Sequence, residues 1–304
     1  MPLRSQLHVD KLLTNVSMKY QNQEHIHDKV FPMLPVAKST DKIRVYVRNQ
    51  RLQETQRSEK AKARETSFEM SFSSYSLEHH ALKDYIGQDE MSDNDVGDLR
   101  ADVVEDLDDK ISLRKEYDFA QLFATSGNWS NNVSLAAAYT SNTTTTNPIP
   151  DFDSAASTVL KQSGMKANKA IIPQDGFIAI KNHTSVIDRL KYTSSEVDKV
   201  KVAALLGVGE LHVPAAQYDS SAEGIAESLS DMYAANAWVG YAAPRAGLRQ
   251  VSAGYMLQKK GQEGKYVRRW IDEERDEAEA IEVNCKYQFK IIASLGGYLI
   301  KGIS

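Results

Sequence analysis

The feature that most constrains the fold is a helical pattern of unusual length in residues 92–126. Its apolar residues recur at intervals of four: Leu99, Val103, Leu107 and Ile111. Ser92 and Asp95 have the spacing of a capping box at its start, and Gly127 is a plausible C-cap at its end. Roughly 32 helical residues at about 1.5 Å each would span about 48 Å, which exceeds a compact domain with a single core. The apolar spacing drifts without sustained heptads, so a coiled coil is not expected.

Two strand patterns precede this helix. Residues 42–48 alternate between apolar and polar side chains, and the alternation returns at Phe68, Met70 and Phe72, as in strands with one solvated face. About twenty mostly polar residues without Gly or Pro separate the two patterns, so a tight hairpin turn does not fit. The sequence instead predicts a long two-stranded finger with an extended tip. Such a ribbon is not stable alone in water, so we expect it to need a partner surface.

The finger and the helix carry opposite charge. Residues 42–64 contain eight basic residues, whereas residues 88–109 contain ten acidic residues and only Arg100 as a basic one. The basic residues are Lys42, Arg44, Arg48, Arg51, Arg57, Lys60, Lys62 and Arg64. Our hypothesis is that the finger of one copy lies across the acidic helix of its neighbour, where charge sets register and steering more than affinity. The alternatives are a finger that charge merely keeps soluble, and nucleic-acid contact, which the lack of interleaved aromatic residues disfavours.

The rest of the chain divides by composition. Residues 1–41 form a mostly extended arm with a hydrophobic anchor around Phe31, and residues 128–150 are a polar loop or linker. Residues 151–247 alternate between helical and strand patterns, as in a mixed α/β domain. The expected helices are 154–162, 174–181, 186–190 and 195–206, and the expected strands are 169–172, 210–213 and 237–242. Residues 248–304 return to strand patterns, of which the alternation over 281–291 is the clearest in the chain.

The amino-acid composition excludes several classes of protein. The 304 residues are 41% hydrophobic and 26% charged, with one cysteine and a formal net charge of -4. The single cysteine excludes an intrachain disulfide, and no apolar run fits a signal peptide or a membrane span. We therefore expect folding in a reducing cytosol. The slightly acidic balance argues weakly against wholesale nucleic-acid binding.

A search for chemical motifs yields no catalytic, cofactor-binding or metal site. His25 and His27 would share one face of an extended arm, as a metal site could use, but no further ligand is recognisable nearby in the sequence. A solvated arm is therefore the interpretation we favour. The acidic run over 272–279 is read in the same way, as a solvated face or turn.

Three other local signals have structural interpretations. Gly207 and Gly209 lack a third glycine at dinucleotide-binding spacing, so they indicate a turn from helix to strand. Cys285 falls on the apolar side of a predicted strand, where an inert packed thiol is expected. His79 and His80 are adjacent, so their rings diverge on a strand.

The order of these parts resembles the major capsid proteins of tailed bacteriophages, which have the Hong Kong 97-type fold. The segments that carry the resemblance are LHVDKLLTNVS (7–17), FPMLPV (31–36), VIDRLKYT (186–193), APRAGL (243–248) and SAGY (252–255). Each is unspecific alone, but their order and spacing span nearly the whole chain.

The resemblance implies an α+β capsid fold with five segments. These are an N-terminal arm (1–41), an extended β-hairpin loop (42–91), the spine helix and linker of a peripheral domain (92–150), an axial α/β domain (151–247) and a peripheral β segment (248–304). Some relatives link a lysine of this loop to a neighbour's asparagine. Lys60 or Lys62 with Asn284 would be the partners, but no motif supports such a link.

The implied function is a structural one: self-assembly as hexamers and pentamers into an icosahedral shell around phage double-stranded DNA. The resemblance also implies a virion protein assembled in the host cytoplasm, with portal, decoration and scaffolding proteins as separate partners. The first shared segment begins at Leu7, which suggests a separate scaffolding protein or assembly without one. The alternatives are the shell protein of a bacterial nanocompartment and, less favoured, an enzyme built on residues 151–247.

Overall fold

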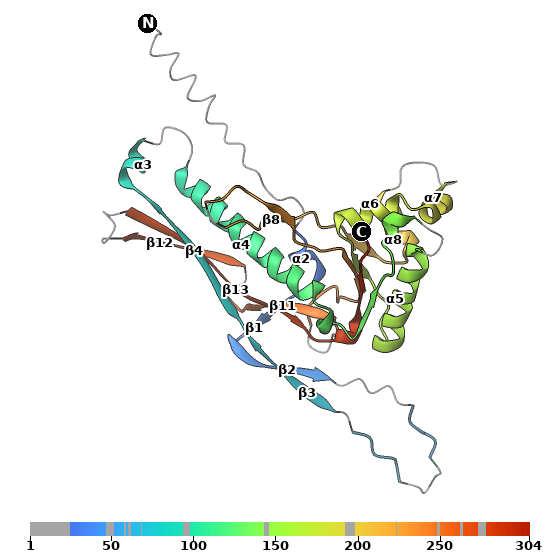
Figure 1. Cartoon of the computed structure of the whole chain (residues 1–304). Coiled ribbons are helices and arrows are strands. Elements are labelled where there is room, and N and C mark those ends of the chain that lie inside the picture. The colour runs from blue at the N-terminus through green and yellow to red at the C-terminus, as the bar shows by residue number, and fades with distance from the viewer. Residues whose placement is uncertain are drawn as a thin grey trace.

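The computed structural model describes residues 25–46, 52–57, 59, 62–67, 69–93, 98–142, 146–191, 198–222, 224–247, 250–261, 264–272 and 278–304. These residues form two five-stranded sheets, two two-stranded sheets and a set of helices around them (Figure 1). In this part of the chain, no helix combines the length and the apolar character that crossing a membrane requires.

The long helix is α4, Leu99–Ala124, and the short helix α3, Gln88–Asp93, precedes it. α4 lies across one face of the first sheet (Figure 1). Residues 94–97 lie outside the described residues, so the expected single helix over 92–126 is seen as these two helices.

Both ends of α4 differ from the predicted caps. The helix begins after Asp98 rather than near Ser92, because the carboxylate of Asp98 accepts a hydrogen bond from the backbone N–H of Arg100 at 3.1 Å. Such a bond satisfies one of the free N–H groups of the first turn. At the other end the C-cap is Thr125, not Gly127, and its Oγ1 donates to the carbonyl one turn earlier at 2.8 Å.

The first sheet is centred on β13, which contains the predicted strand 281–291. Its strands are β1 Met33–Val36, β4 Glu78–Ile86, β11 Gly254–Lys259, β12 Lys265–Asp272 and β13 Ala278–Ile291. β4, β11 and β12 each pair antiparallel with β13, and β1 pairs parallel with β11. The alternation buries Ile281, Val283 and Cys285 in one core with Leu107 and Ile111 of α4.

The predicted finger is confirmed as an antiparallel pair. β2 (Thr40–Tyr46) pairs with β3 (Met70–Ser76), and Arg44 lies opposite Phe72. Figure 1 shows this ribbon projecting away from both large sheets. Residues 47–48 and 68 of the predicted strands lie outside the described residues.

The second sheet has the order β5-β14-β10-β6-β7. Its strands are β5 Asn131–Ser134, β6 Lys169–Ile171, β7 Glu210–His212, β10 Asn236–Gly240 and β14 Gly297–Lys301. The helices gathered beside it in Figure 1 are α5 Pro148–Ser163, α6 Gln174–Lys181, α7 Thr184–Leu190 and α8 Lys199–Leu205. The smaller elements are α2 His27–Val30, the hairpin strands β8 Gln217–Asp219 and β9 Leu229–Asp231, and the 3-10 helices η1 Ser126–Asn128, η2 Tyr139–Ser141 and η3 Ser294–Gly296.

Two expectations about segment boundaries need correction. The stretch 128–150 is not only a loop: it supplies β5 and the first turn of α5, where Pro148 and Pro150 fit because early helical N–H groups have no partner within the helix. The final segment 248–304 does not build one sheet alone, because its last strand, β14, joins the second sheet between β5 and β10.

Strand β10 separates two hydrophobic cores. Trp238 faces the core that α4 and the first sheet share, together with Leu299 of β14. The neighbouring residues Ala237 and Val239 face the second core, which α5, α6 and α8 complete. This division follows from the alternation of side chains along a strand.

Candidate assembly surfaces

The finger presents basic and apolar side chains to solvent. Its described basic residues are all exposed: Lys42, Arg44, Arg57, Lys62 and Arg64. Phe72 and Met70 are 59% and 42% exposed, and Leu52 is 97% exposed. Large apolar side chains gathered beside cations on a projecting ribbon are suited to burial against another protein surface.

The base of the finger is held firmly by the rest of the chain. The backbone N–H of Ser76 donates to Oε1 of Gln288 on β13 at 3.0 Å, and the hydroxyl of Tyr75 donates to the carbonyl of Lys38 at 3.0 Å. These two bonds join the base of the ribbon to β13 and to the segment before β2.

The acidic residues of α4 differ in how exposed they are. Asp106 pairs with Lys110 at 2.7 Å, and Asp108 pairs with Lys265 of β12 at 2.6 Å. Asp102 and Glu105 lie on the exposed side of the helix.

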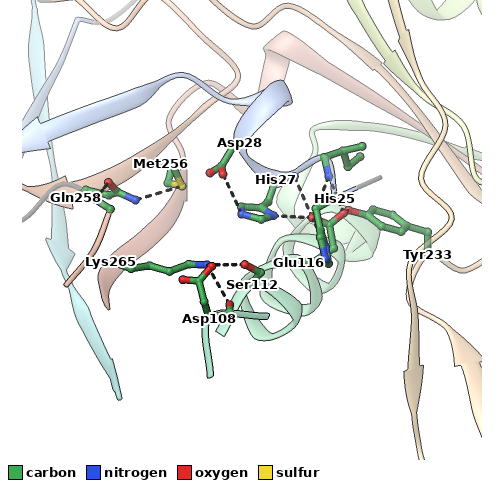
Figure 2. Close-up of polar contacts among 12 residues, drawn as sticks. His25, His27, Asp28, Asp108, Ser112, Glu116, Tyr233, Met256, Gln258 and Lys265 are labelled. Carbon is green, nitrogen blue, oxygen red and sulfur yellow. Dashed lines mark hydrogen bonds and ion pairs between the residues drawn. The ribbon is translucent and has the colours of Figure 1, made fainter. Parts of the chain in front are cut away.

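The arm is joined to α4 through a buried carboxylate. Glu116 is fully buried, and Figure 2 shows His25, His27 and Tyr233 pointing toward it. Its Oε2 accepts hydrogen bonds from the backbone N–H of Ile26 and His27, both at 3.0 Å. The ring Nδ1 of His27 lies 2.7 Å from the same oxygen, and the hydroxyl of Tyr233 donates to Oε1 at 2.5 Å.

The surroundings of this junction favour the charged forms of Glu116 and His27. Burial alone would raise the pKa of Glu116, but the neighbouring ring of His25, together with hydrogen bonds from His27, Tyr233 and the backbone, holds that pKa far below its ordinary value. Burial lowers the pKa of His27, but hydrogen bonds to Asp28 and Glu116 outweigh it and raise the pKa. The junction is therefore a buried ionic contact between chain segments about ninety residues apart.

The expectation of a solvated arm at His25 and His27 is therefore wrong. His27 is 4% exposed, because the arm packs against α4 instead of leaving the body of the chain. The ring of Phe31, the expected anchor, is buried edge-on against Phe119 and Trp238. The available signal was a pair of charged residues, Lys115 and Glu116, within the apolar face of the predicted helix.

The prediction that the acidic residues 272–279 form a solvated face or turn is wrong for one of them. Glu279 is 8% exposed and pairs with Arg100 at 2.8 Å and with Arg269 at 2.9 Å. Residues 273–277 of the run lie outside the described residues.

The other singled-out residues have local structural roles. Gly207, with φ +69, lies in the turn from α8 to β7 as predicted. Cys285 is fully buried, and burial raises the pKa of its thiol. The rings of His79 and His80 diverge: Nε2 of His79 lies 2.9 Å from Oδ1 of Asn284, while His80 stacks on Tyr287.

Two shallow hollows lie beside α6, in the region considered for an enzyme. Both are lined by Asp175 and Ser304; one also contains Tyr139, and the other contains Asp231 and Tyr233. Among the described residues that line them there is neither a histidine nor a cysteine nor a lysine.

The chain is similar in sequence and in fold to proteins of bacteriophages. No protein-family model matches the chain. The major capsid protein of Burkholderia phage BcepMu is 24% identical over 306 residues, covering 97% of each chain. A phage-related protein from Bordetella bronchiseptica has a solved structure that is 26% identical, with a TM-score of 0.74 over 93% of this chain and 94% of that one.

More distant structures share the fold. The capsid of cyanophage P-SCSP1u is 9% identical, with a TM-score of 0.62 over 94% of this chain and 90% of that one. The SrpI encapsulin of Synechococcus elongatus is 12% identical, with a TM-score of 0.56 over 100% and 97%. The predicted Hong Kong 97-type α+β fold and the resemblance to phage major capsid proteins are thus both confirmed.

Proposed function

We propose that this chain is the major capsid protein of a tailed bacteriophage, whose copies assemble into the icosahedral shell of the virion. One observation carries the proposal: the capsid fold extends over nearly the whole chain, and the phage capsid relative matches it over 97% of both lengths. The role is structural, and the chain acts through its surfaces rather than through a catalytic site.

The segments take the following roles in this proposal. The first sheet and α4 form the peripheral domain, and the second sheet with α5–α8 forms the axial domain that meets its copies around hexamer and pentamer centres. Residues 42–91 form the extended loop and residues 1–41 the arm. Strands β5 and β14 are assigned to the axial side, because both belong to the second sheet.

Assembly follows from elements that a single copy leaves uncovered. The β2–β3 ribbon exposes apolar and basic side chains together, and a two-stranded ribbon gains stability when a third surface covers it. A neighbour's α4 offers Asp102 and Glu105 for the basic side chains. The finger of one copy would thus contact a different surface, α4, on the next copy. A chain of such contacts closes into a ring when the rotations between successive copies add up to a full turn.

The remaining partners follow from the role of a shell. A net charge of -4 gives weak, nonspecific contact with the enclosed double-stranded DNA. A portal, possible decoration proteins and a separate scaffolding protein would complete the particle, which would assemble in the host cytoplasm.

A nanocompartment shell protein is the second candidate, and the SrpI encapsulin neighbour is the observation that favours it. The phage role is preferred because the sequence relative is a phage capsid protein. An enzyme built on residues 151–247 is the least supported candidate.

The test is negative-stain electron microscopy of the purified chain together with size-exclusion chromatography. Closed shells, hexamers or pentamers are the expected result, and the contents of the shells then distinguish a phage head from a nanocompartment. A chain that stays monomeric at high concentration and with candidate scaffolding proteins would refute the shell function.

A further inference from the structure

The arm junction contains three metal-ligating side chains from distant parts of the chain. One ring nitrogen of His25, one ring nitrogen of His27 and a carboxylate oxygen of Glu116 all lie within 4.8 Å of one another. The two histidines come from the arm and the glutamate from α4 (Figure 2). Among the residues that the structure describes, these three side chains form the one group of at least three His, Cys, Asp or Glu residues whose ligand atoms lie this close together.

One ring nitrogen at the junction has no hydrogen-bond partner, and another holds a proton that a metal ion could displace. Nε2 of His27 lies 3.2 Å from Oδ2 of Asp28, while its Nδ1 lies 2.7 Å from Oε2 of Glu116. Because each ring nitrogen faces a carboxylate, both carry an N–H, and the proton on Nδ1 is the one that a metal ion would replace. Nδ1 of His25 is buried without a hydrogen-bond partner, 3.8 Å from the same oxygen.

We propose that His25, His27 and Glu116 bind a divalent transition metal ion of the Zn²⁺ class, which fastens the arm to α4. The ligand atoms would be Nδ1 of each histidine and Oε2 of Glu116. Imidazole nitrogen and carboxylate oxygen suit Zn²⁺, whereas Mg²⁺ and Ca²⁺ prefer oxygen ligands alone. The ion takes the place of the proton between His27 and Glu116, and that proton passes to solvent.

The geometry requires only small movements. Ligands at about 2.0–2.1 Å from a tetrahedral ion lie about 3.3 Å apart. The 2.7 Å separation of His27 and Glu116 must therefore lengthen slightly, and the 3.8 Å separation of His25 and Glu116 must shorten slightly. The side chain of His25 is 26% exposed, which leaves an entry path and room for water as a fourth ligand.

The surroundings have the features of an outer ligand shell. A metal-bound histidine usually donates its second ring N–H to a carboxylate or carbonyl oxygen, and Asp28 provides this acceptor for His27. Tyr233 and the backbone N–H of Ile26 hold the other oxygen of Glu116 in place. A metal link here would order the arm at the point where it leaves α4, whether or not the chain is assembled.

The experiment is a titration of the full-length, untagged and chelator-treated protein with Zn²⁺, followed by isothermal titration calorimetry. We expect one ion per wild-type chain and at least a ten-fold loss of affinity in His25→Ala, in which no hydrogen bond of Nδ1 is lost. His79→Ala, which removes an exposed histidine from β4, is the matched control and should bind like the wild type. Asp28→Asn should weaken binding by about 10–100-fold through the outer shell.

Measurement of the Tm with and without Zn²⁺ distinguishes the loss of metal binding from poor folding of a variant. Zn²⁺ should raise the Tm of the wild type and of His79→Ala, but not that of His25→Ala. Absence of Zn²⁺ binding by the wild type, or equal binding by His25→Ala, would overturn the proposal. Because both measurements are made on the unassembled chain, failure to form shells would refute the capsid function while leaving this test intact.

Discussion

Gly240 and Gly297 lie opposite each other in strands β10 and β14, and the indole of Trp238 fills the space beside both. A Cβ at Gly240 would lie 2.2 Å from Cζ2 of Trp238, and one at Gly297 would lie 2.4 Å from its Nε1. Trp238 is fully buried against Phe31 of the arm and Trp129 after α4. The glycine pair thereby determines how closely the arm, α4 and the second sheet approach one another.

The substitution Gly297→Ala should therefore destabilise the chain. The added methyl group would overlap the buried rings of Trp238 and Trp129, at a cost of about 1–3 kcal/mol. Urea unfolding of the unassembled protein measures the change. Gly127→Ala is the control, because a Cβ there meets nothing within 4 Å; equal stability of the two variants would contradict the argument.

Asn168 should be sensitive to loss of its side-chain amide. Its Nδ2 donates to the carbonyl of Ala242 at 2.7 Å, and its Oδ1 accepts from the N–H of Ala242 at 2.9 Å. Asn168→Ala leaves both backbone groups without these partners and should cost about 1–3 kcal/mol. Thermal unfolding measures this cost, with Asn132→Ala on the exposed side of β5 as the control. A Tm for Asn168→Ala that matches this control would disprove the role.

His212 should make the chain less stable in acid. Burial lowers the pKa of its imidazole to about 4 from the usual 6.5, and nearby Lys169 adds to the effect. Between these values the unfolded chain binds a proton that the folded chain does not, so the stabilisation is complete above pH 6.5 and is lost as the pH falls toward 4. The total loss is at most about 3 kcal/mol.

The pH effect can be assigned by comparing unfolding free energies at pH 7, 5.5 and 4.5. The His212→Gln variant should show a smaller decrease than the wild type over this range. The control is His79→Gln, which should follow the wild type. Parallel curves for His212→Gln and the wild type would show that other groups cause the acid sensitivity.

Charge reversal in the finger should impair assembly without unfolding the chain. The triple change Lys42→Glu, Arg44→Glu and Arg64→Glu alters only exposed side chains, so circular dichroism and Tm should stay close to the wild type. Electron microscopy should show fewer closed shells, because the finger then repels the acidic side of a neighbour's α4.

The compensating variant makes this prediction specific. Asp102→Lys and Glu105→Lys reverse the exposed charges of α4, and adding them to the triple variant should restore shells. Normal assembly of the triple variant alone would exclude the charge contact. Failure of the combined variant to recover would indicate that the finger meets a different surface.

Local periodicity allowed the sequence alone to predict many of the elements. The alternation around Val283 predicted β13, the interval of four from Leu99 to Ile111 predicted the body of α4, and the polar stretch after β2 predicted a ribbon rather than a tight hairpin. Each prediction rests on which face of a helix or strand is apolar, and neighbouring residues carry that information. The resemblance of several short segments to phage capsid proteins supplied the order in which the elements are arranged.

The tertiary structure decided which faces meet. The buried contact between His27 and Glu116 joins residues 89 positions apart, and β14 enters the second sheet beside β10 although β13 immediately precedes it in strand order. The sequence indicated an apolar face on the helix but not that the arm would bury its histidines there. Periodicity shows that a face will be buried, whereas its partner depends on the path of the whole chain, because long-range contacts form only when the other elements have brought distant segments together.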